Sequence, residues 1–280
     1  MTTRALWRRS VNLLFVALCS LATAIALAAL AMILWSLVSQ GIGGLDLNIF
    51  TMTQPAPGST GGLINAITGS LMMCAVAMGI AIVIGILAGT WLAEYGGDTA
   101  YGHAIRFLND VLLSAPSILI GLFVYEVLVR PFHGFSGYAG GVALALLATP
   151  IVTRTTEDIV RLQPASLREA GMALGATHAF VIRRVIWRAA GAGLLTGVLL
   201  GFARISGETA PLLFTSLGNQ FFSLDMTQPM ASLPTTIFQF ALSAYDDWRR
   251  PAWVGALLIA AAVLAINISG RLVARETHRP

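Results

Sequence analysis

Six long runs of apolar residues divide this chain, and each is long enough to cross a lipid bilayer. A bilayer core needs about 20 mostly apolar residues per helix. In lipid, the backbone polar groups must be satisfied within the protein, which a helix does by itself. The sequence therefore predicts an all-α fold, a polytopic membrane helix bundle with six transmembrane helices. The predicted spans cover roughly residues 12–38, 63–93, 107–129, 137–160, 189–217 and 252–273.

The charged residues are few and unusual in kind. Only 11% of residues are charged, whereas 56% are hydrophobic, and a soluble domain is normally about a quarter charged. All 17 basic residues are arginines, so the lysine of a P-loop nucleotide site is missing. We therefore expect no enzyme activity in this chain. If ATP drives its function, ATP hydrolysis is expected on a separate subunit.

The distribution of arginines predicts the orientation of the spans, because cytoplasmic segments are enriched in positive charge. With the N-terminus inside, cytoplasmic segments hold twelve arginines and outside segments hold three. Both termini are therefore expected in the cytoplasm. The excess of basic over acidic residues is explained by this membrane topology, so no nucleic acid partner is expected. The first apolar run is too long for a signal peptide, which predicts an uncleaved span.

Two ionised pairs interrupt the spans. Arg204 precedes Glu208 by four residues, which places both on one helix face. Arg154 lies three residues before Glu157 and four before Asp158. An arginine at the bilayer centre costs about 2.5–3.5 kcal/mol on insertion scales, so these groups are expected to face a polar interior. If the two helices pack together, the arginines form a series across the membrane.

Two interpretations of these charges remain open. In one, they are intrahelical salt bridges with a structural role only. In the other, Arg154, Glu157, Arg204 and Glu208 line a pathway for an anion. Guanidinium never deprotonates and binds oxyanions through paired hydrogen bonds. The carboxylates would orient the arginines in an empty pathway, and Glu208 or Glu157 could accept a proton from a hydrogen-bearing oxyanion.

The loop between the charged spans, residues 161–188, has the signals of two short helices. Ser166 and Glu169 are spaced as a capping box. Gly175 is placed to end the first helix at C′, and a second helix is expected near Thr177. Small residues at 170, 171, 173 and 175 would allow close contact with another protein.

This loop, with "EAGMALG" before an apolar helix, resembles the EAA loop of ABC importer permeases. Glu169, Ala170 and Gly175 match that motif, whereas Gly171 stands in place of its second alanine. Trp187-Arg188 replaces the Leu-Pro ending. The resemblance implies a type I ABC importer permease fold, in which a cytoplasmic coupling helix docks into an ATPase subunit. Glu169, Ala170, Gly171 and Gly175 are then the residues expected to couple to the ATPase.

Four further segments narrow the family: "LSAPSILIGLFVYEVLV", "TRTTEDIVRLQPASLREAGMALGAT", "GFARISGETAPLLFT" and "MASLPTTIFQFALSAYDDW". Together they resemble the A-type permease subunits of the bacterial high-affinity phosphate importers, the Pst system. In that family, residues matching Arg154, Glu157 and Arg204 are regarded as transport residues.

The resemblance implies an inner-membrane complex with several partners. These are a C-type permease, an ABC ATPase dimer and a periplasmic phosphate-binding protein, with inorganic phosphate as substrate. It also divides the chain into residues 1–62, with the first span, and a permease core of five spans at residues 63–280.

Alternative functions remain. A permease for another oxyanion, such as sulfate or molybdate, would need the same arginines, and a membrane assembly scaffold could use these charges structurally. The four histidines are scattered without a paired spacing, so no metal site and no cofactor are expected. Pro116 predicts either a kink or a break in the third span. Residues 233–248 are expected to form an amphipathic helix at the membrane interface.

Overall fold

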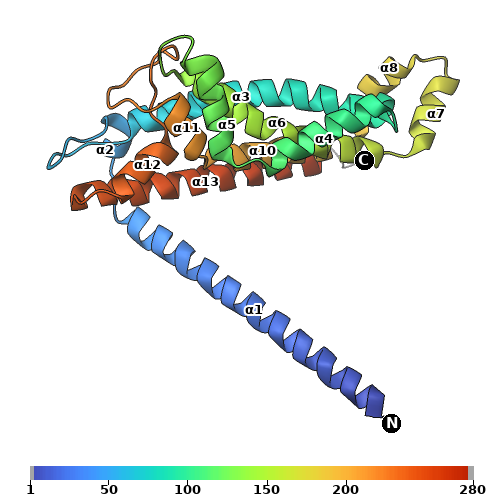
Figure 1. Cartoon of the computed structure of the whole chain (residues 1–280), viewed down its shortest axis with the longest axis horizontal. Coiled ribbons are helices and arrows are strands. Elements are labelled where there is room, and N and C mark those ends of the chain that lie inside the picture. The colour runs from blue at the N-terminus through green and yellow to red at the C-terminus, as the bar shows by residue number, and fades with distance from the viewer. Residues whose placement is uncertain (1–2, 277–280) are drawn as a thin grey trace.

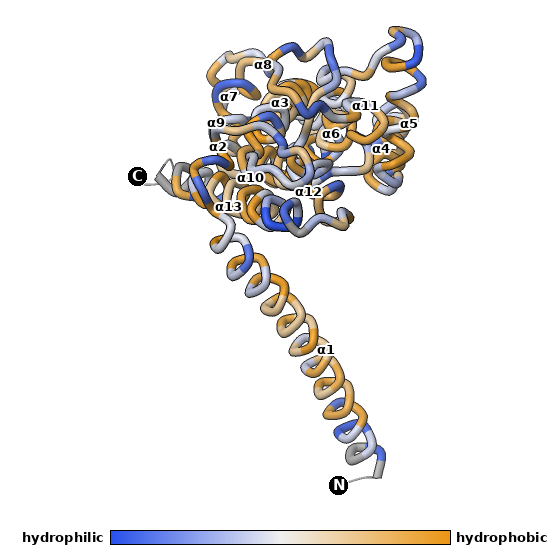
Figure 2. Tube along the Cα trace, turned by 90° about the vertical axis from the view of Figure 1, so that its left-hand side faces the viewer, coloured by the Kyte–Doolittle hydropathy of each residue, from blue (hydrophilic) through white to orange (hydrophobic). Residues whose placement is uncertain are grey.

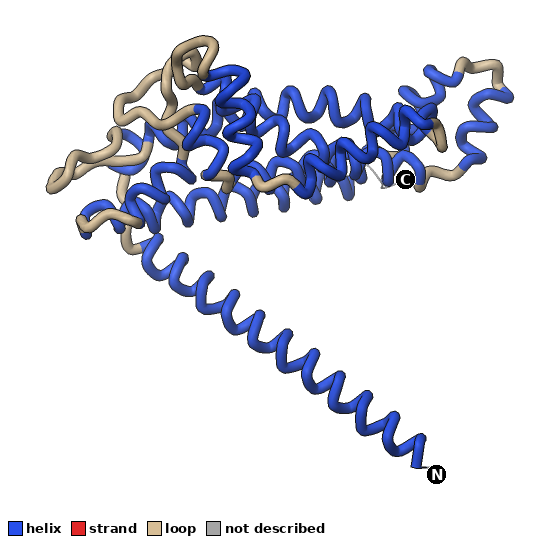
Figure 3. The backbone as a smooth tube through the Cα atoms, in the orientation of Figure 1, coloured by secondary structure: helices blue, strands red, loops and turns tan. Residues whose placement is uncertain are grey.

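The computed structural model describes residues 3–276, and within this range the regular structure is helical, without a strand (Figure 3). This confirms the all-α prediction. Three π-helical turns, η1 (Leu92–Gly96), η2 (Tyr125–Val129) and η3 (Ile182–Ile186), continue α3, α5 and α8. The helices in chain order are α1 (Thr3–Ile42), α2 (Asn48–Thr51), α3 (Ile64–Trp91), α4 (Ala100–Ser114), α5 (Ser117–Val124), α6 (Gly137–Arg161), α7 (Ala165–Ala173), α8 (His178–Val181), α9 (Trp187–Ala189), α10 (Gly191–Ser206), α11 (Ala210–Thr215), α12 (Leu233–Ala241) and α13 (Asp246–Glu276).

The centre of the bundle is the contact between α3 and α6, with α10 packed beside α6 (Figure 1). Glycines allow the first two helices to approach closely. A Cβ atom added at Gly85 of α3 would lie 2.7 Å from Cβ of Val152 on α6. The main apolar core surrounds this contact and includes Met73, Ala81 and Leu144, all nearly inaccessible to solvent. Small residues thus serve here as in other membrane bundles, where they let helix backbones come together.

The first helix, α1, leaves the bundle at one end and runs beside it at an angle (Figure 1). Every residue from 7 to 35 is exposed, and Figure 2 shows that most of this length is apolar. Only its last turns pack on α13, where a Cβ atom added at Gly41 would meet Leu257 at 2.8 Å. Most of α1 is therefore available to lipid or to another chain.

The structure modifies two of the six expected spans. Four segments of the described chain are long and apolar enough to cross a membrane: Trp7–Ile42, Ile64–Gly96, Gly137–Arg161 and Asp247–Leu272. Two bent pairs raise this number to six if each counts as one span. Ala100–Ser114 and Ser117–Val129 meet at 106°, and His178–Ala189 and Gly191–Ser206 meet at 74°.

The spans expected at 107–129 and 189–217 are therefore not continuous helices. Ala115, at φ −66° and ψ 134°, is extended, because the residue before a proline is pushed out of the α region. This breaks the helix at Pro116. The later helix ends at Ser206 and restarts as α11. Pro211 has no N–H to donate to the carbonyl four residues earlier, so a continuous helix through Gly207 is disfavoured.

At the end of the bundle opposite α7 and α8, α12 packs against α13 and α3. The amphipathic helix expected at 233–248 is therefore present but shorter, and it buries its apolar face in the protein. Leu233 and Phe240 are buried there, and the Ser232 hydroxyl accepts a hydrogen bond from the Thr235 N–H. The two ends of the bundle thus differ: one carries α11 and α12, and the other carries the loop with α7 and α8 (Figure 1).

Replacing Gly85 with leucine is expected to destabilise the fold by about 1–3 kcal/mol, because the new side chain would overpack the α3–α6 contact. The matched control is Gly79→Leu on the same helix, since a Cβ atom at Gly79 meets nothing within 4 Å. Thermal unfolding of the full-length protein in detergent measures both variants. Equal melting temperatures for Gly85→Leu and the unaltered protein would contradict the close packing.

Candidate functional site

The two arginines predicted to lie in the spans are on neighbouring helices, and both are about half exposed. Arg154 on α6 pairs with Asp158 at 3.5 Å, with side-chain exposures of 47% and 57%. Arg204 on α10 pairs with Glu208, with exposures of 50% and 9%. Pairing of Arg204 with the carboxylate four residues later is as the sequence predicted. Neither arginine is sealed inside this chain.

The packing of α6 on α10 sets the relative height of these arginines. The helices are antiparallel, with Gly193 of α10 against Ile159 of α6 and Gly201 against Val152. This register places Arg204 opposite residue 148 or 149, about six residues from Arg154. At 1.5 Å per residue, the two arginines are separated by about 9 Å along the helix axis. They are arranged in series, as expected from the sequence.

The exposed face of α6 differs from its buried face. Arg154 and Asp158 are exposed, whereas Val152, Thr153 and Thr156 are buried towards α3. The hydroxyls of Thr153 and Thr156 therefore do not join the arginines, although they lie beside them in sequence. An arginine within a span is unfavourable against lipid. The exposed face of α6 and α10 consequently requires water, polar groups or another chain in front of it.

Glu157 does not pair with Arg154, which corrects the expectation from the sequence. It lies on the buried side of α6, with its side chain only 3% exposed. Arg106 on α4 donates through Nε to Oε1 of Glu157 at 2.7 Å, and Nη2 of Arg161 lies 2.9 Å from the same oxygen. Around the helix axis, Glu157 is turned about 60° from Arg154 to one side and Asp158 about 40° to the other, so Arg154 pairs with Asp158 while Glu157 points to the buried side.

The loop beyond α6 forms two short helices, as the sequence predicted. Gly175 has φ +82° and ends α7. Its N–H donates to the Met172 carbonyl, and the Ala176 N–H donates to the Gly171 carbonyl, which is the Schellman pattern of a helix C-terminus. The second helix begins after Thr177, whose hydroxyl accepts from the Phe180 N–H.

The predicted capping box in this loop is wrong. Ser166 lies inside α7, which begins at Ala165 after Pro164, and no side chain caps its first turn. The fixed φ of Pro164 starts the helix instead. Glu169 and Ala170 are exposed, whereas Gly171 faces inward, where an added Cβ atom would lie 2.7 Å from Val181. Of the four residues expected to contact an ATPase, two are therefore on the surface of α7 and two shape the loop.

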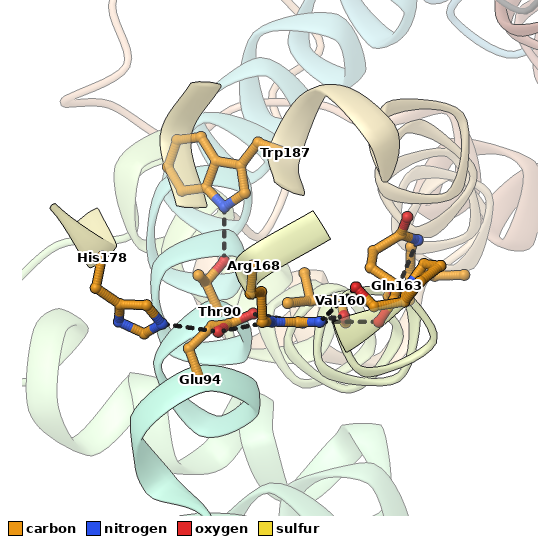
Figure 4. A network of polar contacts seen from close by, with 9 residues as sticks. Thr90, Glu94, Val160, Gln163, Arg168, His178 and Trp187 are labelled. Atoms are coloured by element: carbon orange, nitrogen blue, oxygen red, sulfur yellow. Dashed lines mark hydrogen bonds and ion pairs between the residues drawn. The ribbon is translucent and has the colours of Figure 1, made fainter. Parts of the chain in front are cut away.

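A polar network that we did not predict joins this loop to η1 at the end of α3 (Figure 4). Nη2 of Arg168 on α7 lies 2.6 Å from Oε1 of Glu94 in η1. Nε2 of His178 lies 3.4 Å from Oε2 of the same carboxylate. Trp187 donates through its indole nitrogen to the Thr90 hydroxyl at 3.1 Å. The sequence did contain one signal for this network. Glu94 follows a long apolar helix at its C-terminal end, where the helix dipole disfavours negative charge, so a cationic partner would be needed there.

The described residues contain no group of three or more His, Cys, Asp and Glu side chains that could hold a metal ion. The polar features described above are pairs and clusters of arginines and carboxylates on the helices of the bundle and on the loop at its α7–α8 end. Such a chain can present cations to a solute on one face and a docking loop at one end.

The chain belongs to the family of binding-protein-dependent transport system inner membrane components, the permeases of ABC importers, because the family profile matches residues 81–279. Two relatives are phosphate transport system permease proteins PstA. The Haemophilus influenzae protein is 51% identical over 269 residues, which cover 96% of this chain and 95% of its own. The Yersinia pestis protein is 49% identical over 274 residues, 97% and 93% of the two chains.

The fold is also found in solved structures. A chain of a bacterial alginate ABC transporter, in complex with an alginate pentasaccharide-bound periplasmic protein, aligns with a TM-score of 0.67. It covers 97% of both chains at 13% identity, so this likeness concerns the fold alone. Together with the family match, it confirms the ABC importer permease fold implied by the EAA-like loop.

Replacing Glu157 with glutamine is expected to lower the free energy of unfolding by about 3 kcal/mol, since it leaves Arg106 without its buried counter-charge. The matched control is Asp158→Asn, which removes an exposed carboxylate at the next position and is expected to change stability by less than about 1 kcal/mol. Chemical denaturation in detergent measures both. Equal effects of the two substitutions would contradict the different burial of these carboxylates.

Proposed function

We propose that this chain is a permease subunit of an ATP-driven importer of inorganic phosphate and forms half of its translocation pathway. The observation that carries this proposal is the series of half-exposed arginines, Arg154 and Arg204, on the open face of α6 and α10. The names of the relatives at about 50% identity indicate the substrate.

The arginines suit this substrate chemically. Each guanidinium can offer two parallel N–H groups to a tetrahedral oxyanion. Asp158 and Glu208 hold the guanidinium groups while the pathway is empty, and they compete with the anion, so that it can leave. Glu208 can also accept a hydrogen bond from the protonated oxygen of hydrogen phosphate, a group that sulfate lacks at neutral pH. Glu157 is not part of this pathway in our proposal, because its two arginine partners already neutralise it.

The second half of the pathway is assigned to a C-type permease facing α6 and α10. A periplasmic phosphate-binding protein would dock at the α11–α12 end. An ABC ATPase dimer would bind the loop at the other end, which is consistent with the absence of lysine from this chain. Besides Glu169, the loop exposes apolar side chains that suit such a contact: Leu174 is 89% exposed and Met172 is 47% exposed.

We place the α7–α8 end in the cytoplasm of a bacterial inner membrane. The excess of arginines in the segments at this end supports that orientation. The first and last described helices, α1 and α13, also begin and end towards this side of the molecule (Figure 1). Both termini are thus assigned to the cytoplasm.

Other oxyanions remain the second candidate, because sulfate and molybdate would also bind guanidinium groups. Competition in whole-cell uptake of radioactive phosphate separates these substrates. A membrane scaffold is disfavoured by the half-exposed arginines, which would be unfavourable without an aqueous or polar partner. Co-purification tests it, since stoichiometric recovery of an ATPase and a second permease supports a transporter.

Replacing Arg154 or Arg204 with glutamine is expected to reduce phosphate uptake about tenfold or more, because each change removes a charge-assisted hydrogen bond to the anion. Assembly with the other subunits should persist. The matched control is Arg130→Gln. Arg130 also pairs with a carboxylate four residues away, that of Glu126, but its own side chain is 71% exposed. Uptake by this variant should equal that of the unaltered protein. Normal uptake in either pathway variant would show that its arginine is structural.

Reversing the charge at Glu169 with arginine is expected to abolish uptake while the protein still inserts into the membrane, because α7 would no longer fit the ATPase surface. The control is Asp98→Arg, an exposed acidic residue at the same end of the bundle but outside α7. Uptake assays and membrane fractionation measure both variants. Unchanged transport by Glu169→Arg would reject the docking role of this side chain.

A further inference from the structure

Two buried carboxylates at the α7–α8 end are not part of the proposed pathway. Each of them binds an arginine that comes from a different helix. Glu94 lies in η1, directly after α3, and Glu157 lies in the last part of α6. Each has a side chain only 3% exposed. A buried carboxylate is stable only when it is paired with a cation and hydrogen-bonded. Loss of its partner is therefore energetically costly.

Arg168 of α7 binds the Glu94 carboxylate and also donates hydrogen bonds to carbonyl groups at the end of α6 (Figure 4). Its Nε lies 3.0 Å and 3.1 Å from the two oxygens of Glu94. The same guanidinium donates through Nη2 to the Val160 carbonyl at 2.9 Å and through Nη1 to the Gln163 carbonyl at 2.8 Å. These carbonyls lie at the C-terminal end of α6, where a cation is favoured by the helix dipole.

Arg106 of α4 makes the reciprocal arrangement. It binds the carboxylate of Glu157 on α6 through Nε, and it donates to the Gly97 carbonyl at 2.8 Å and the Leu92 carbonyl at 3.2 Å. The last two carbonyls belong to η1 and the residue after it. Each arginine therefore binds the end of one helix and the carboxylate of the other. We call these four side chains, Arg106, Glu157, Arg168 and Glu94, the crossed clamp.

The crossed clamp adds a connection between α7 and η1 that the polypeptide chain does not provide. Along the chain, the loop continues through α9 into α10, but this path is bent by 74° at Ala190. The clamp instead connects α7 directly to α3 and α6 through a planar guanidinium with several simultaneous hydrogen bonds. The second helix of the loop, α8, contacts the Glu94 carboxylate through His178. The centroids of the His178 and Tyr95 rings lie 5.2 Å apart in an edge-on arrangement.

We propose that Arg168 and Glu94 are positioning residues that transmit movement of the ATPase-docked helix α7 to α3 and α6. The inference rests on the proposed function, because it assumes that α7 is the helix that the ATPase displaces. A displacement of α7 without η1 would leave the buried Glu94 carboxylate without its arginine, which is unfavourable, so the two are expected to move together. Since α6 also carries Arg154, movement at the loop reaches the open face that contains the pathway arginines.

The test compares phosphate transported with ATP hydrolysed in the complete importer, reconstituted in proteoliposomes with its phosphate-binding protein. For Arg168→Gln and Glu94→Gln we expect ATP hydrolysis to continue while phosphate transported per ATP falls about tenfold. The double variant should be no worse than either single one, because both remove the same link. Arg184→Gln, at an exposed arginine of the same loop, is the control and should keep the normal ratio.

The ratio separates transmission from a merely structural role. If these residues were merely structural, the assembled fraction would fall, but transport and ATP hydrolysis would fall together. An unchanged ratio in the complex that does assemble would therefore overturn the inference. If Arg168→Gln does not assemble, Arg168→Lys decides the question. Its single ammonium group can reach the Glu94 carboxylate but cannot also span the α6 carbonyls as the guanidinium fork does. An intermediate ratio is then expected, and a normal ratio would reject the proposal.

The proposed function fails in a different way. If the unaltered complex transports no phosphate, or if its ATP hydrolysis does not respond to the phosphate-loaded binding protein, then the assignment as a phosphate importer is wrong. If the unaltered complex couples the two and the Arg168 and Glu94 variants couple equally well, only the role of the crossed clamp is wrong.

Discussion

Ionised side chains within a mostly apolar chain must be neutralised, and this requirement determines which helices of the bundle are tied together and which arginines stay accessible. A buried carboxylate must keep a cationic partner. At the α7–α8 end, Glu94 is paired with Arg168 of α7, and Glu157 is paired with Arg106 of α4 as well as with Arg161 of its own helix. The arginines on the open face of α6 and α10 have their own partners only one turn away. The first arrangement ties helices together, whereas the second leaves cationic groups accessible. One chemical requirement therefore explains both the cross-linked end of the bundle and the accessible arginines on its open face.

Features set by local sequence were predictable. The apolar runs gave the helical class and most of the spans, the Gly175 position gave the end of α7, and the four-residue spacing gave the Arg204–Glu208 pair. Each of these depends on residues within one or two turns, where helix geometry fixes which side chains meet. The EAA-like loop was also recognisable because its residues are contiguous.

Features set by contacts between distant residues were not predictable. Glu157 lies three residues from Arg154, yet it binds Arg106, 51 positions away, together with Arg161. Arg168 binds Glu94 over 74 positions. In the sequence, both arginines indicate membrane topology only, because the charge distribution does not show which arginine and carboxylate will be buried together. The capping box failed for a local reason: Pro164, two residues before Ser166, starts α7 at Ala165, so Ser166 lies inside the helix.

The attachment of α1 to α13 has a consequence for how this protein is made. Arg250 donates to the Gly43 carbonyl across 207 positions, and Gly41 packs on Leu257. At about 5–20 residues per second, a ribosome needs roughly 10–40 seconds to produce this partner after the first helix has emerged. During that time the first helix must wait in the bilayer with its end undocked. This contact therefore joins two segments that the ribosome makes well apart in time.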